Sequence, residues 1–135
     1  MKSLLIIIND PPYHKSERAW NGLRVANTAI NAGGKVNIFL LSNAVYLARR
    51  AHNPPENLPN LETMLKKLLD KGVRVKVCTT CVTSRSFEPG EEFQSCFIGT
   101  KEEKMGPVDL IPGVEMGTMA QLFEWTQETE RIVSF

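Results

Sequence analysis

The sequence lacks a strong excess of charge of either sign. Its 16 lysine and arginine residues are balanced by 15 aspartate and glutamate residues, which gives a formal net charge of +1, and no basic run exceeds two residues. Proteins that bind nucleic acids or anionic membranes through charge usually concentrate basic side chains. The composition therefore predicts neither direct nucleic-acid binding nor membrane attachment.

Long apolar runs are also missing. The run Leu4–Ile8 near the N-terminus is shorter than the core of a signal peptide, and it is followed at once by Asn9-Asp10-Pro11-Pro12. We interpret it as a buried strand. On this basis we expect a cytoplasmic protein.

Cysteine is scarce, and the count of three is odd, which does not suit a disulfide framework. Cys78 and Cys81 are spaced as C-x-x-C, a pattern that in a cytoplasmic chain favours redox, sulfur or metal chemistry. Cys96 stands in an irregular segment, and we expect it to be a small buried hydrophobe.

The remaining sequence alternates between strand and helix patterns. Apolar residues recur at period two in the strands and at helical spacing in the helices. The expected strands are 3–8, 35–41, 73–77, 114–115 and 131–135, and the expected helices are 16–32, 42–50, 60–71 and 118–127. Strand, helix and strand at these lengths form right-handed units with parallel strands.

This order predicts an α/β domain with a three-layer arrangement. About five mainly parallel strands form the sheet, and helices cover both faces. At 135 residues the chain is expected to be one domain, 1–135, with a surface insertion at about 87–108.

Three segments with reactive side chains are expected at the carboxyl edge of this sheet, where ligands gather in such folds. They are the loop with Tyr13 and His14, the loop from Arg49 to His52, and the cysteine pair. We assign neither histidine a catalytic role, because a lone loop histidine is an ordinary feature.

The cysteine pair permits several kinds of chemistry. If the residues after Cys78 open a helix, both thiols lie at its N-terminus, where the helix dipole favours a thiolate, and Arg85 one turn on adds positive charge. A zinc site would need Cys96 with His14 or His52, and the usual second ligand pair is missing. Disulfide exchange and a merely structural pair remain open. No cofactor and no resident metal are expected.

Helix 118–127 is predicted to bury Met119, Leu122 and Phe123. Trp20 and Trp125 fall outside the apolar stripes of their helices. They are either exposed contacts between subunits or core residues on a stripe that is rotated from the predicted one.

Four segments in order resemble the DsrE/DsrF-like family, which includes YchN-like and TusD-like proteins. They are Ile6–Asp10, Ala26–Leu40, Val75–Arg85 and Ile111–Met119. The resemblance implies a flavodoxin-like parallel sheet and assembly with itself, as a trimer or hexamer, or with paralogous subunits. It also implies sulfur relay between donor and acceptor proteins, with sulfane sulfur held as a persulfide on the cysteine that ends the third strand.

In this sequence that cysteine is Cys78, and Cys81 matches a second cysteine found in some members. The first hypothesis is therefore a sulfur carrier, resembling a sulfurtransferase, that uses Cys78 and Cys81. The alternative is a non-catalytic oligomeric binding module in which the C-x-x-C pair is structural or senses redox state.

Overall fold

The computed structural model describes residues 2–13, 16–85, 96–97 and 109–135. The expected insertion at 87–108 lies outside the described residues, apart from Cys96 and Phe97. Among the helices in these ranges, none has the length and apolar character needed to cross a membrane.

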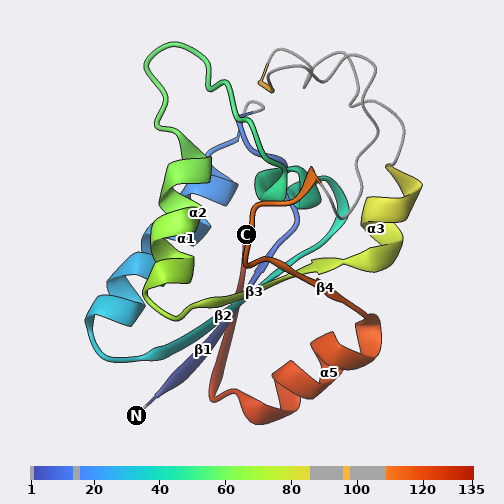
Figure 1. The fold of residues 1–135 in the computed structure, drawn as a ribbon. Coiled ribbons are helices and arrows are strands. Elements are labelled where there is room, and N and C mark those ends of the chain that lie inside the picture. Colours follow the sequence, from blue (N-terminus) through green and yellow to red (C-terminus); the bar gives the residue numbers. More distant parts are fainter. Residues whose placement is uncertain (1, 14–15, 86–95, 98–108) are drawn as a thin grey trace.

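The centre of the molecule is a five-stranded, fully parallel sheet with the strand order β4-β3-β2-β1-β5. The strands are β1 (Ser3–Ile8), β2 (Lys35–Leu40), β3 (Arg74–Cys78), β4 (Glu115–Gly117) and β5 (Arg131–Ser134). Helices cover both faces (Figure 1). The predicted α/β architecture is confirmed.

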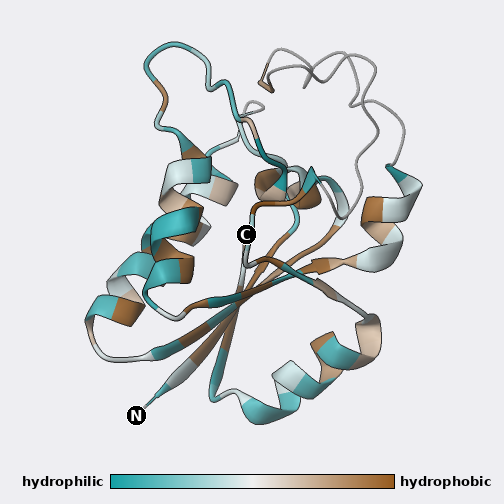
Figure 2. Cartoon of the chain, in the orientation of Figure 1, coloured by the Kyte–Doolittle hydropathy of each residue, from teal (hydrophilic) through white to brown (hydrophobic). Residues whose placement is uncertain are grey.

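One face of the sheet is covered by three elements. They are α1 (Arg18–Asn31), the short 3-10 helix η1 (Ser42–Ala48) and α2 (Leu61–Asp70), and Figure 1 shows α1 and α2 side by side. The predicted β2 pattern is confirmed here, because Val36, Ile38 and Leu40 all enter this core. Figure 2 shows apolar residues gathered in the strands and in η1, with hydrophilic residues along α1 and α2.

The other face is packed by α5 (Met119–Glu128), whose buried residue is Trp125. Its indole meets Phe39 of β2 edge to face, with ring centroids 6.1 Å apart. Trp125 is only 6% exposed, so the interpretation of this residue as a subunit contact is wrong.

The predicted buried stripe of α5 is also partly wrong. Met119 and Phe123 are 55% and 63% exposed, while Leu122 is half-buried. The helix is rotated from the expected orientation because the large indole of Trp125 fills the space above β2. The core between the sheet and α1, η1 and α2 is called the first core, and the core under α5 the second. Trp20 on α1 is half-buried against the first core.

Helix starts differ from the expectation by one or two residues. The first helix begins at Arg18 with Glu17 as its N-cap, and Ser16, the expected start, lies two residues earlier, where its hydroxyl accepts the Arg18 N–H at 3.2 Å. The helix expected at 60–71 begins at Leu61, and Asn60 caps it, since the Asn60 side chain accepts the Thr63 N–H.

Candidate functional site

The cysteine pair lies where β3 ends and α3 (Thr79–Ser84) begins, at the carboxyl edge of the sheet (Figure 1). Along β3, Val75 and Val77 point into the first core, so Cys78 points to the opposite face. Cys78 is the residue that caps α3, and Cys81 lies in its first turn. The condition set for the thiols, that the residues after Cys78 open a helix, is therefore met, and the structure brings the two thiols together.

Each sulfur accepts a backbone hydrogen bond. The Cys81 N–H donates to Cys78 Sγ at 3.4 Å, and the Ser42 N–H donates to Cys81 Sγ at 3.3 Å. Both cysteines are reduced in the structure. Because a backbone N–H favours negative charge on sulfur, each contact supports the form that reacts.

Ser42 is a site residue that sequence reasoning missed. It was expected only as the first residue of helix 42–50, yet its backbone adopts φ +54°, an uncommon conformation for a residue with a side chain. This conformation is found where β2 turns into η1, next to the end of β3. The sequence holds no signal for it, because the approach of Ser42 to Cys81 depends on the adjacency of β2 and β3.

The two thiols differ in access. Cys78 is 3% exposed and packs with Leu5, Phe39 and Trp125, whereas Cys81 is half-buried at the border of both cores. Burial, and then the neighbouring Cys81 side chain, raise the pKa of the Cys78 thiol. The expectation of a neutral-pH thiolate is therefore wrong for Cys78, since loss of hydration outweighs the helix terminus.

Arg85 is held close to the pair by hydrogen bonds to other groups. Its Nε donates to Asn43 Oδ1 at 2.8 Å, and its Nη1 donates to the Cys81 carbonyl oxygen at 3.3 Å. The guanidinium thus ties α3 to η1. In this position it fixes the backbone of Cys81, and the structure shows no direct bond from it to either sulfur.

His52, in the loop that follows η1, is buried and belongs to a chain of hydrogen bonds. Its Nε2 lies 3.1 Å from the Leu47 carbonyl oxygen, and its Nδ1 lies 2.7 Å from the Tyr13 hydroxyl. A carbonyl only accepts, so Nε2 carries the proton and Tyr13 donates to Nδ1. The Tyr13 oxygen in turn accepts the Leu61 N–H at 2.9 Å. His52 therefore joins the loop after β1 to the loop after η1.

This burial makes the stability of the protein depend on pH. Burial lowers the pKa of His52 from 6.5 to about 4, because the charged imidazolium loses its hydration. Between these values the unfolded chain binds more protons, so the free energy of unfolding falls as the pH drops from 6.5 to 4. The full loss is about 3 kcal/mol.

Urea unfolding at several pH values measures this effect. In His52→Gln the decrease between pH 6.5 and 4 is expected to be smaller by about 3 kcal/mol. His14→Gln, which removes the other histidine of the sequence, is measured in parallel, so that the contributions of the two histidines are separated. Equal decreases in the wild type and His52→Gln would contradict this assignment.

Cys96 is 5% exposed and packs in the first core, as expected for a small buried hydrophobe. His52 is already hydrogen-bonded on both ring nitrogens. Within the described ranges, no group of three or more His, Cys, Asp or Glu side chains could hold a metal ion. His14 lies outside these ranges. The arrangement of the pair itself suits thiol exchange between two neighbouring sulfurs.

Known proteins match this chain along its whole length. A family model described as the DsrE/DsrF-like family matches residues 2–135. An uncharacterized protein of Methanocaldococcus jannaschii is 40% identical over 96% of both chains, and the protein YchN of Escherichia coli is 30% identical over 100% of both.

Solved structures agree with these matches. The crystal structure of YchN superimposes with a TM-score of 0.77 at 31% identity and covers all of both chains. A protein of unknown function from Methanobacterium thermoautotrophicum has a TM-score of 0.71 with 13% identity over both full chains, a likeness of fold alone. The chain therefore belongs to the DsrE/DsrF-like family and is similar to YchN throughout its length.

Proposed function

We propose that the protein is a sulfane-sulfur carrier in which Cys81 receives the sulfur and Cys78 stores it. The observation that carries the proposal is the geometry of the pair: two reduced cysteines in one helical turn, each accepting a backbone N–H, with only Cys81 open to solvent. Family membership supports it, because sulfur relay is often linked to this family.

Two thiol exchanges account for loading. The Cys81 thiolate attacks the outer sulfur of a donor persulfide, forms a new S–S bond, and the donor leaves as a thiolate. The Cys78 thiolate then attacks the same outer sulfur, which moves to Cys78 and frees the Cys81 thiolate. Neither step changes the total number of electrons. An acceptor thiolate removes the sulfur by the reverse route.

A non-catalytic oligomeric binding module, whose cysteine pair is structural or senses redox state, is the second candidate. The burial and raised pKa of Cys78 favour the structural role, because both keep its reactive thiolate scarce. If the pair senses redox state instead, Cys81 attacks the inner sulfur of a Cys78 persulfide, which closes a disulfide and releases hydrosulfide. The released sulfide and the loss of two free thiols distinguish this outcome from storage.

Intact mass spectrometry tests the function. Anaerobically purified protein, incubated with a low-molecular-weight persulfide and desalted, is expected to gain one sulfur atom, to keep it through a brief thiol wash, and to lose it slowly, by way of Cys81, on prolonged incubation with an acceptor thiol. No gain in protein whose thiols are shown to be reduced would exclude the carrier function.

The carrier proposal includes donor and acceptor proteins and self-association as partners. Among the residues that the structure describes, large apolar side chains that an assembly would cover are exposed at Val25, Met119, Phe123, Ile132 and Val133. Four of them lie on α5 and on the edge strand β5.

A further inference from the structure

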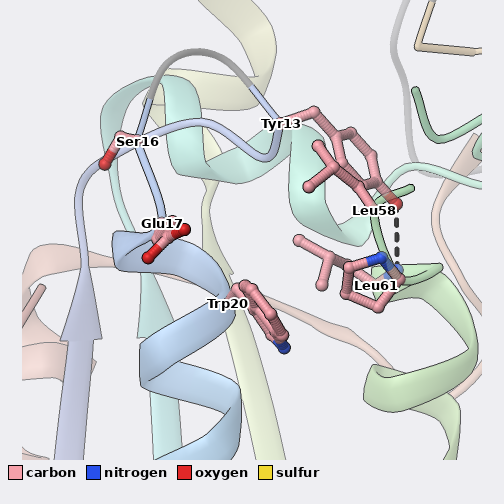
Figure 3. A pocket seen from close by; sticks show the side chains of 7 residues that line it. Tyr13, Ser16, Glu17, Trp20, Leu58 and Leu61 are labelled. Atoms are coloured by element: carbon pink, nitrogen blue, oxygen red, sulfur yellow. Dashed lines mark hydrogen bonds between the residues drawn. The ribbon is translucent and has the colours of Figure 1, made fainter. Parts of the chain in front are cut away.

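A pocket of about 240 Å³ lies between the start of α1 and the start of α2, separate from the cysteine pair. Figure 3 shows Trp20 projecting from α1 toward Leu61, with Tyr13 and Leu58 across from it and Glu17 above Trp20 on the same helix. The pocket was not predicted, because its walls come from two stretches that are distant in sequence, 13–20 and 58–61.

Hydrogen bonds within the protein hold the walls of the pocket in place. The Tyr13 hydroxyl bonds both the Leu61 N–H and the His52 ring, and the first of these bonds is drawn in Figure 3. Tyr13 holds this position with φ +69°, an uncommon backbone conformation for a bulky residue. Leu61 is the first residue of α2, so one hydrogen bond ties the loop after β1 to that helix.

Most of the lining is apolar or aromatic, and one charged group stands beside it. The Ser16 hydroxyl is already bonded to Asp10. The Glu17 carboxylate, by contrast, makes no hydrogen bond or ion pair within the described part of the chain, and Glu17 is exposed. Two aromatic side chains next to a free carboxylate form the combination that recognises organic cations.

The indole of Trp20 already interacts with a cation of the protein. The guanidinium carbon of Arg24 lies 5.3 Å from the centre of the Trp20 ring, outside the residues that line the pocket. Aromatic rings attract cations through the negative potential of their faces. The same property is available to a ligand, while Glu17 supplies the charge that the apolar walls lack.

We propose that this pocket binds a small organic cation that joins an apolar ring to an ammonium group, the chemistry of an arylalkylamine. The ring lies among Tyr13, Trp20, Leu58 and Leu61, and the ammonium pairs with Glu17. The volume accommodates a single ring with a short chain. This site goes beyond the proposed sulfur chemistry and does not depend on it.

Titration followed by NMR tests the proposal on the full chain. The two tryptophan indole N–H signals, assigned with Trp20→Phe, report on the pocket and, through Trp125, on the opposite face of the sheet. With 2-phenylethylamine the Trp20 signal is expected to shift saturably while the Trp125 signal stays in place. Phenylacetate, which has the opposite charge, should give no saturable shift.

Two variants distinguish the contribution of the Glu17 charge to binding from the contribution of the pocket's shape. Glu17→Gln is expected to weaken 2-phenylethylamine several-fold and to leave the weaker binding of the neutral 2-phenylethanol unchanged. Leu58→Trp, at an exposed position of the rim, should fill the pocket and abolish the Trp20 shift. Glu128→Gln removes an exposed carboxylate elsewhere and should bind as the wild type does.

Three outcomes would overturn the assignment. They are no saturation of the Trp20 signal by the amine, equal binding of the amine, alcohol and acid, and unchanged amine affinity in Glu17→Gln. A two-dimensional amide spectrum shows that each variant is folded, so loss of binding through unfolding is recognised.

Discussion

Cys78→Ala is expected to abolish the stable storage of sulfur. In the wild type the transferred sulfur reaches a cysteine that is 3% exposed, where small thiols have little access. In the variant it remains on Cys81, which is open to solvent, and a brief wash with glutathione removes it. Intact mass before and after the wash measures the difference.

The Cys81→Ala variant tests which thiol of the pair reacts first with the donor. Of the pair it leaves only the buried Cys78, whose raised pKa keeps its reactive thiolate scarce, so loading should be several-fold slower than in the wild type. The rate in this variant should rise with pH as Cys78 ionises.

Cys96→Ala serves as the control for loading, because Cys96 packs in the other core. It should load and retain sulfur as the wild type does. If Cys78→Ala kept its sulfur after the glutathione wash, the stored sulfur would be on a residue other than Cys78. Loading of Cys81→Ala at the wild-type rate would show that donors reach Cys78 directly.

Trp125→Ala is expected to lower the free energy of unfolding by about 3–5 kcal/mol, as for other large aromatic residues deleted from cores. The indole is the buried contact of α5 with the sheet and meets Phe39 edge to face. It also covers the Lys76 side chain, whose Nζ lies 5.0 Å from the ring centre. Urea unfolding monitored by circular dichroism measures the loss.

Phe123→Ala, two residues earlier on the same helix, is the matched control. Because Phe123 is 63% exposed, the expected change is within about 0.5 kcal/mol. Because an assembly would cover Phe123, both variants and the wild type are compared as monomers, at a concentration at which sedimentation shows no association. A larger loss for Phe123→Ala than for Trp125→Ala would mean that α5 packs in the orientation first predicted from sequence.

Local patterns were enough to predict the elements and the position of the cysteine pair. The strand Ser3–Ile8 and the helix that begins after Asn60 each rest on residues close in sequence, and both appear close to the expected positions. The alternation of β3 also predicted a strand that runs directly into Cys78. Such features are decided by steric preferences and backbone hydrogen bonds within a few residues.

Only the tertiary structure decided what surrounds those residues. The rotation of α5 depends on how one indole fits over Phe39, and the contact of Ser42 with Cys81 depends on β2 lying beside β3. The raised pKa of Cys78 has the same origin, because burial comes from packing by distant segments and outweighs the local helix terminus. The sequence by itself thus determined the α/β order and the thiol pair, whereas three-dimensional packing determined which thiol meets solvent.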